Sequence, residues 1–560
     1  MLTKLSFEDN LYNLLLEKKY ETILEFLKNP ENEELIKSRV WNLINKICLT
    51  VKTNNILEHE SDLVLCKKIL LHIVDHGKPR EVIVALMEEA DSFKEHSFFC
   101  LLLEPLKKTL KKVPSKRVKT LEWVLSSLNA HIESLPPPND YDLEGEEKML
   151  LDATPEVVDS NYVLSNYYSF VEFFIDEVSS EKTKSSADRI EFQREILRKY
   201  ILKLFHHPFL YLDLHVEDER KSKSTTHILC ENYLKSLCRI CRNVFDLYKY
   251  EQSSFPIKKI AAEEDCEEPV SLLAFSNLSY LIFVEKLAID SQPFVYSHKY
   301  IFMNNLKYMK QLLHETNNCV LFKGLLLTRE LLNSLESFEI SYSCVEINLY
   351  TELSKLLLNV AVHCQVKHCR QIAINNFLTY IEKCDWKARY HLILQVVCTV
   401  EHSGCVGLAI DLYKNYLHTN MNDPTSYFLG KNLMLFMKKV FILLEGAETD
   451  LLENNDRIMS TLNFLRYLVL RDDRSKNFTG IWDIIDALSE SYLKPLAEAI
   501  NLSRAHYKET AKQAGKKQKT VVTVNNTLMP SAAWKEIYEK ALLNFDVLES
   551  LLSRIREIIE

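Results

Sequence analysis

Glycine is scarce in this chain, and that scarcity limits the folds it can adopt. Only 9 of 560 residues are glycine, whereas globular domains average ~7%. Tight β-hairpins and phosphate-binding loops need glycine, either for a positive φ angle or for a close approach of the backbone. The composition therefore argues against a β-sandwich, a Rossmann fold and a P-loop, and favours helices.

Apolar residues recur at the helical period along nearly the whole chain. One such stripe consists of Phe192, Ile196, Leu197, Tyr200, Ile201, Leu204 and Phe205. Spacings of three and four residues place such a set on one side of a helix. After residue 306 the expected helices form antiparallel pairs: 306–313 with 319–332, 349–363 with 370–383, and 389–399 with 407–418. A pair about every 40 residues is typical of HEAT and armadillo repeats. We therefore predict an all-α fold, an irregular HEAT/armadillo-like helical-repeat solenoid with two lobes.

Polar segments interrupt this periodicity and suggest a division of the chain. They bury too little apolar surface to offset the entropy of ordering, so we predict loops there. The predicted parts are an N-terminal helical-repeat segment 1–135, an acidic Pro-rich loop 136–160, a middle helical segment 161–305 with polar inserts near 216–226 and 251–268, a C-terminal HEAT-like region 306–507, a basic flexible loop 508–531 and a C-terminal helix 532–560.

Charge and composition argue against several classes of partner. The net charge is −9, so the chain as a whole has no basic footprint for nucleic acid. The chain contains no uninterrupted run of about 18 apolar residues, so a membrane span is not expected. The N-terminal sequence MLTKLSFEDN has no apolar secretory core, so we expect a cytoplasmic protein whose 14 cysteines are reduced.

No motif points to catalysis or to a cofactor. The chain contains no G-x-x-x-x-G-K-[ST], G-x-G-x-x-G, G-x-S-x-G or H-E-x-x-H sequence. Cys238-x-x-Cys241 lacks the second pair of ligands that zinc sites usually have. Cys364 and His368 are spaced to share a helix face and could hold a metal, although packing roles are the simpler interpretation. We expect no metal, no cofactor and no enzymatic activity.

A basic cluster near residue 508 could attract nucleic acid or an acidic lipid surface. It consists of Lys508, Lys512, Lys516, Lys517 and Lys519. The cluster has no interleaved aromatic residues on which bases could stack. We interpret it as a solvated linker.

The helix expected after Asp456 is the candidate for partner binding. At about 100° per residue, one face carries Ile458, Leu462, Leu465 and Val469, which we predict to be core. The opposite side carries Asp456, Ser460, Asn463, Tyr467 and Arg471, flanked by Arg457 and Phe464. Either a neighbouring helix covers these residues, or they form a ridge that binds a partner, since aromatic and arginine side chains are favoured anchors.

Short strings in the C-terminal region resemble the glomulin family, in its vertebrate form. They are EGAETDLL from Glu445, DRIM from Asp456, LRYLV from Leu465, LKPL from Leu493 and AHY from Ala505. The resemblance implies a non-enzymatic, HEAT-like inhibitor of cullin–RING ubiquitin ligases. Such a protein binds the RING of the ring-box subunit through its C-terminal region and masks the surface for the ubiquitin-conjugating enzyme. An immunophilin and a receptor tyrosine kinase are also linked to the family.

We therefore predict a RING-binding site formed by Arg457, Asn463, Phe464, Tyr467, Arg471, Lys476, Asn477 and Trp482. Two other classes of protein remain open. A generic helical-repeat scaffold, binding an immunophilin or receptor complex or serving vesicle or nuclear transport, would have the same composition. An enzyme of unknown type would be revealed by a bound metal or nucleotide.

Overall fold

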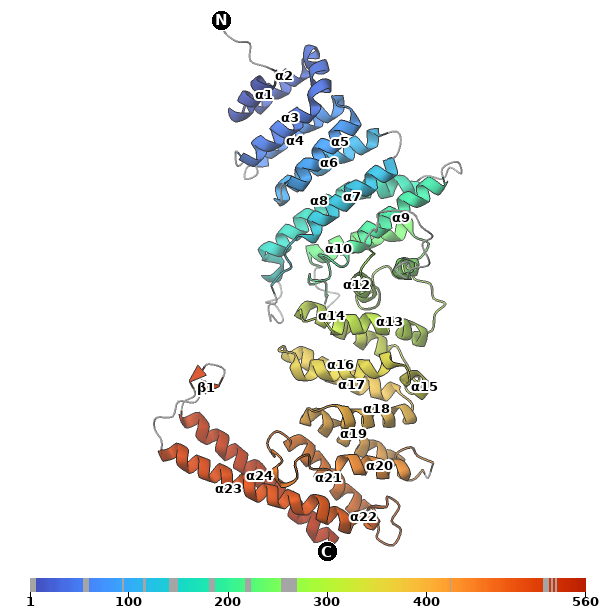
Figure 1. Ribbon diagram of the computed structural model, residues 1–560. Helices are drawn as coiled ribbons and strands as arrows, with labels where there is room; N and C mark the ends of the chain where they lie inside the picture. The colour runs from blue at the N-terminus through green and yellow to red at the C-terminus, as the bar shows by residue number, and fades with distance from the viewer. Residues whose placement is uncertain are drawn as a thin grey trace, which may run out of the picture. The chain divides into compact units, whose positions relative to one another are not determined.

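The computed structural model describes residues 7–53, 60–92, 95–113, 117–139, 150–180, 187–216, 223–252, 269–423, 425–516, 523–524, 527–528 and 531–560. The chain divides into two compact units, Met1–Leu331 and Leu332–Glu560. Each unit is a stack of helices (Figure 1). The all-α helical-repeat solenoid predicted from the sequence is confirmed.

The N-terminal unit is built from consecutive helices. Its helices are α1 (Phe7–Leu16), α2 (Tyr20–Lys28), η1 (Pro30–Asn32), α3 (Glu33–Thr53), α4 (Glu60–His76), α5 (Pro79–Ser92), α6 (His96–Lys112), α7 (Arg117–Glu133), α8 (Pro155–Ser180), α9 (Ala187–Leu204), α10 (Thr225–Ile240), η5 (Val244–Tyr248), α11 (Lys249–Gln252), α12 (Leu272–Phe283), η6 (Ile289–Ser291), α13 (His298–Leu313) and most of α14 (Asn318–Asn333).

The C-terminal unit continues the helical pattern and ends in a long helical hairpin. Its elements are α15 (Tyr342–Val345), α16 (Asn348–His363), α17 (Lys367–Lys383), α18 (Trp386–Thr399), α19 (Ser403–Asn420), α20 (Lys431–Val440), η7 (Gly446–Glu448), α21 (Asn455–Arg471), α22 (Ile481–Leu488), η8 (Ser489–Leu493), α23 (Lys494–Lys516), β1 (Thr523–Val524), β2 (Thr527–Leu528) and α24 (Ser531–Ile559). The two short strands pair antiparallel, with Thr523 opposite Leu528. Helices α23 and α24 lie side by side in Figure 1.

The repeat pairs expected after residue 306 match helices of the structure. Helix α16 packs against α17, and α18 packs against α19. In α14, a Cβ atom added at Gly324 would lie 2.8 Å from Cβ of Leu312, so α13 and α14 cross closely at that glycine.

The apolar stripe predicted on the segment that forms α9 is buried with one exception. Ile196, Leu197, Ile201 and Leu204 belong to the core of the N-terminal unit, whereas Phe192 is 42% exposed. Ile190 and Gln193 in the same part of the helix are buried, so Phe192 lies at the edge of the covered arc. The helical period therefore identifies the buried face, while the ends of that face depend on neighbouring helices.

Most of helix α14 belongs to the N-terminal unit. The sequence had predicted that the C-terminal region begins at residue 306, before this helix. The Lys323 side chain is 2% exposed, and its ammonium donates to the carbonyls of Phe209 and Leu210 at 2.8 and 2.7 Å. A buried ammonium needs such acceptors. These carbonyls belong to the segment after α9, and the boundary between the units falls at Leu331.

Two of the predicted loops are shorter than expected. Helix α8 already begins at Pro155, and helix α23 continues through Lys508 to Lys516. Within the predicted polar segments, residues 140–149, 217–222, 253–268, 517–522, 525–526 and 529–530 lie outside the described residues. Lys517 and Lys519 also lie outside them.

The described residues contain no group of three His, Cys, Asp or Glu side chains placed to hold a metal ion. Cys369 is buried in α17, whereas His368 points toward solvent. Within the same described ranges, no helix has the length and apolarity that crossing a membrane requires.

Candidate partner-binding site

Helix α21, which carries most of the predicted site residues, is anchored by its apolar face. Ile458, Leu462, Leu465 and Val469 are buried, as the helical period predicted. The helix packs against α19, α22 and α24. These contacts fix which of its side chains remain available to a partner.

Helices α19 and α21 cross at Gly407. A Cβ atom added there would lie 3.0 Å from the backbone carbonyl oxygen of Asp456 and 3.2 Å from Oγ of Ser460. The Arg457 amide, in the first turn of α21, donates to Oγ of Ser403 at 3.0 Å. One of the amides that a helix N-terminus leaves without an intrahelical partner is thereby satisfied by α19.

Two residues that the sequence placed on the outward side of α21 are buried against α19 and α20. Ser460 donates to Oδ2 of Asp411 at 3.1 Å. Phe464 is 0% exposed, and its ring lies against Tyr413, Phe436 and Phe441, with centroids 5.9, 5.8 and 6.0 Å away. The prediction of Phe464 as a surface contact is therefore wrong. Two helices cover this flank of α21, so its buried arc is wider than one stripe.

Three further predicted residues on α21 are half-buried. The Tyr467 hydroxyl lies 3.1 Å from Nδ1 of His418 and donates to Sδ of Met421 at 3.7 Å, at the end of α19. Arg457 lines a small cavity beside Tyr492, and burial lowers the pKa of its guanidinium. Asn463 is also half-buried. Only part of each of these three side chains is therefore accessible to a partner.

The other predicted residues lie at the end of α21, in the connection to α22 and at the start of α22. A buried carboxylate, that of Asp472, organises this turn by accepting hydrogen bonds from the amides of Phe478 and Thr479 at 3.0 and 2.7 Å. The Trp482 indole N–H donates to the Asp472 carbonyl at 3.0 Å. Asn477 has a positive φ of 41°, and its Oδ1 accepts from the Trp482 amide at 3.2 Å. Asn477 and Trp482 thus have structural roles in the turn.

The same turn exposes charged and apolar side chains. Arg471 and Lys476 are exposed, and the Arg474 guanidinium lies 4.6 Å from the ring centroid of Trp482. Arg474 also donates to the carbonyl of Ile559, which ties the turn to α24.

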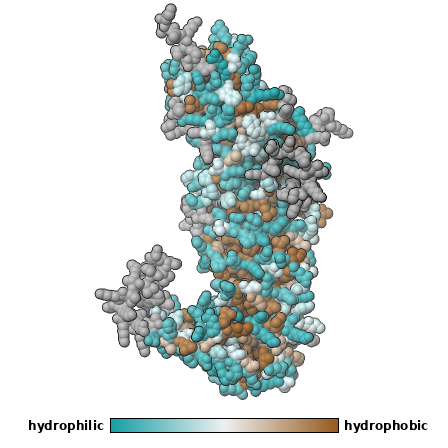
Figure 2. Space-filling view, viewed as in Figure 1, coloured by the Kyte–Doolittle hydropathy of each residue, from teal (hydrophilic) through white to brown (hydrophobic). Residues whose placement is uncertain are grey.

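Two apolar residues that the sequence reasoning missed are prominent here. Leu470 is 59% exposed and Phe478 is 69% exposed. A signal for Phe478 was present, because it is the one aromatic residue in the polar run RDDRSKNFT and continues no apolar stripe. We call Leu470, Arg471, Lys476, Phe478 and Trp482 the α21–α22 surface. Figure 2 shows hydrophobic residues (brown) on the visible face of the C-terminal unit.

The surface carries no arrangement of nucleophile, base or metal ligands. It combines two aromatic rings, one guanidinium group, one ammonium group and an exposed leucine on a turn held by internal hydrogen bonds. Aromatic and arginine side chains are favoured at protein–protein interfaces. The chemistry that this geometry supports is recognition of another protein.

Comparisons with known proteins agree over nearly the whole chain. The model of a family described as "Uncharacterised protein family, YAP/Alf4/glomulin" matches residues 2–250 and 309–536. Glomulin of Mus musculus is 27% identical over 557 residues, which cover 96% of this chain and 90% of the mouse protein. Glomulin of Homo sapiens is 27% identical over 559 residues, covering 96% and 91%. The family match includes the α21–α22 surface, and on this evidence the chain belongs to the YAP/Alf4/glomulin family.

Proposed function

We propose that this protein is the counterpart of vertebrate glomulin and acts in the cytoplasm as a non-enzymatic inhibitor of cullin–RING ubiquitin ligases. In this proposal the C-terminal unit binds the RING of the ring-box subunit. The bound unit then covers the surface that receives the ubiquitin-conjugating enzyme. The observation that carries the proposal is the family match, which extends through the C-terminal unit.

The α21–α22 surface supports the proposal through the chemistry of its exposed side chains. Phe478 and Leu470 can enter the apolar groove of a RING, and Arg471 and Lys476 can pair with carboxylates or backbone carbonyls around it. Asp472 holds the turn before any partner arrives. A preorganised turn loses less conformational entropy on binding.

The structure changes the set of contacts that we propose. Phe464 is excluded because it is buried. Arg471, Lys476, Phe478 and Leu470 become the central contacts, with Asn477 and Trp482 supporting them. Arg457, Asn463 and Tyr467 remain proposed contacts at the border of the surface, where each is half-buried.

Inhibition by masking requires steric overlap and no chemistry. A standard interface buries about 800 Å² on each partner, which is a large share of a domain as small as a RING. A stack of helices provides a rigid surface of that size. No catalytic group is required of the protein, which agrees with the absence of catalytic motifs in its sequence.

The test measures binding and inhibition with purified full-length protein and a neddylated cullin–ring-box complex. Arg471→Glu and Phe478→Ala should each weaken binding about thirtyfold or more, the loss expected for a true anchor. The matched controls Lys355→Glu on α16 and Ile374→Ala on α17 change an exposed cation and an exposed apolar residue elsewhere in the same unit. These controls should bind like the wild type.

Three outcomes would contradict the proposal. If both surface variants keep their fold and inhibit ubiquitin-chain formation at wild-type concentrations, the α21–α22 surface is not the binding site. If the wild-type protein binds the complex but leaves the conjugating enzyme free to discharge ubiquitin, masking is wrong. If the ring-box subunit does not bind while an immunophilin or a receptor tyrosine kinase does, the protein is a scaffold of another kind.

A further inference from the structure

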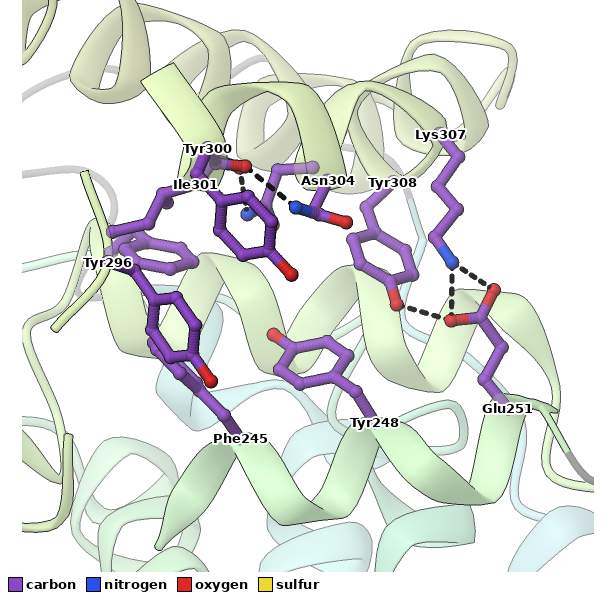
Figure 3. Close-up of a pocket in the computed structure, with 11 residues that line it drawn as sticks. Phe245, Tyr248, Glu251, Tyr296, Tyr300, Ile301, Asn304, Lys307 and Tyr308 are labelled. Atoms are coloured by element: carbon purple, nitrogen blue, oxygen red, sulfur yellow. Dashed lines mark hydrogen bonds and ion pairs between the residues drawn. The ribbon is translucent and has the colours of Figure 1, made fainter. Parts of the chain in front are cut away.

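The N-terminal unit contains a cavity walled by aromatic rings. Its volume is about 200 Å³, and it lies between η5, α11 and the end of α12 on one side and α13 with its preceding segment on the other. The rings are those of Phe245, Tyr248, Phe283, Tyr296, Tyr300 and Tyr308. Figure 3 shows Tyr300 and Tyr308 extending from α13 toward Tyr248 on the opposite wall.

Contacts between the rings hold them in place. The centroids of Tyr248 and Tyr308 are 5.4 Å apart, and those of Tyr296 and Tyr300 are stacked at 5.1 Å. The hydroxyl of Tyr248 lies 2.7 Å from Oγ of Ser279. These distances fall in the range of favourable aromatic pairs. The cavity is therefore a preformed set of rings.

One ammonium group already lies against this set of rings. The Lys307 ammonium is 4.8 Å from the centroid of Tyr308 and 2.5 Å from the nearer carboxylate oxygen of Glu251. The Tyr308 hydroxyl donates to the same carboxylate at 2.5 Å (Figure 3). The electron-rich face of a phenol attracts cations, and here the protein supplies one at the edge of the cavity.

The size and polarity of the cavity restrict what else could enter. A single water needs only about 10–15 Å³ of such space, so the cavity accepts a much larger group. The Glu251 carboxylate, which could serve a new ammonium, is already occupied by Lys307 and Tyr308. Oδ1 of Asn305, which also lines the cavity, is free to accept one hydrogen bond. A primary ammonium carries three N–H donors, so it would need further acceptors in this partly enclosed site. A quaternary ammonium has no N–H donors and satisfies its charge against ring faces.

We propose that this aromatic cavity binds a quaternary ammonium group. The group could belong to a choline-type small molecule or to a trimethyllysine side chain of a peptide, because both present the same trimethylammonium end. The site lies entirely within the N-terminal unit. It is therefore independent of the proposed binding of a RING by the C-terminal unit.

The first experiment titrates the full-length protein by calorimetry with tetramethylammonium, choline, a trimethyllysine peptide and 3,3-dimethylbutanol. The last compound is the neutral isostere of choline, with carbon in place of nitrogen. The charged ligands should bind at least about tenfold more tightly than this isostere. Tighter binding of the peptide than of choline would identify a protein source, and the reverse a small molecule. Equal binding of choline and its isostere would overturn the proposal, because the cavity would then be merely apolar.

Variants of the wall give a second and sharper test. Tyr300 is 52% exposed, so it can be changed with little effect on folding. Tyr300→Leu should weaken binding about fivefold through loss of a ring face, whereas Tyr300→Phe should retain it.

Substitutions of Lys307 and of Glu251, which form an ion pair, should change the affinity for the ligand in opposite directions. Lys307→Met removes a like charge near the ligand and should strengthen binding of the quaternary ammonium, whereas Glu251→Gln should weaken it. Lys307 and Glu251 are both partly exposed, at 41% and 20%, and a melting curve will show whether each variant is folded. Affinity changes of the same sign in the two variants, or none in either, would refute binding of a cation here.

Discussion

Replacing Phe464 with alanine should destabilise the C-terminal unit without removing a direct contact to a partner. The Phe464 ring is fully buried between α19, α20 and the segment after α20, where it meets Tyr413, Phe436 and Phe441. Truncation would leave a cavity that these rings cannot close, because each is itself held by other contacts.

The magnitude of the loss follows from the burial of the side chain. Moving a phenylalanine side chain out of water contributes about 1.5–3 kcal/mol, and each favourable ring pair adds about 0.5–1.5 kcal/mol. Substitutions of this kind in protein cores cost about 3–5 kcal/mol. We expect a loss in that range. Phe478→Ala, at an exposed ring, should stay within about 0.5 kcal/mol of the wild type.

Hydrogen exchange read by mass spectrometry is the suitable assay, because a chain of two units need not unfold in one step. A loss of 3 kcal/mol corresponds to roughly hundredfold faster exchange of the protected amides of α21. Amides of the N-terminal unit should keep their rates. If Phe464→Ala leaves α21 exchange unchanged and yet abolishes binding to the ring-box subunit, Phe464 is a surface contact and the packing described above is wrong.

Two further predictions concern the crossing of α19 with α21 and a buried carboxylate. Gly407→Ala should lower the melting temperature, because the added methyl group would lie 3.0 Å from a backbone carbonyl oxygen. The control Gly404→Ala should leave the melting temperature unchanged, because its methyl group would meet only side chains that can move. Equal effects of the two variants would mean that α19 and α21 do not pack closely at Gly407. Burial raises the pKa of Glu285, but hydrogen bonds from His215 and Tyr280 outweigh it and hold the pKa below its usual value. The ionised Glu285 carboxyl therefore stabilises the folded state at pH values above its unfolded-state pKa of about 4.3. This contribution is lost as the pH falls through the lower pKa that the carboxyl has in the folded state. Glu285→Gln should flatten this acid limb in denaturant melts between pH 3 and 6, and an unchanged slope would count against it.

Much of the fold was predictable because helix formation depends on local spacing. The scarcity of glycine and the apolar period together indicated an all-α solenoid, and the buried face of α21 was correct at Ile458, Leu462, Leu465 and Val469. These four residues follow one another at intervals of three and four, so their common direction is a property of the helix itself.

The candidate site was predictable only in part. The period placed Phe464 away from the core stripe, on the flank of the outward side, and it could not show that α19 and α20 both cover that flank. Likewise, Asn477 and Trp482 looked like free side chains in a polar loop, whereas Asn477 caps the Trp482 amide and the indole bonds to Asp472. Phe478, the residue after Asn477, carries the exposed ring.

The sequence by itself determined most of the helical segments and the centre of each apolar face, because both follow from the chemistry of neighbours along the chain. Tertiary structure alone decided which flanks are covered and which distant residues meet. Tyr248 and Tyr308 are far apart in sequence, yet their rings lie 5.4 Å apart on facing walls of one cavity. Contacts between distant residues arise where helices cross, as α19 and α21 do at Gly407. The position of each crossing depends on how whole helices pack.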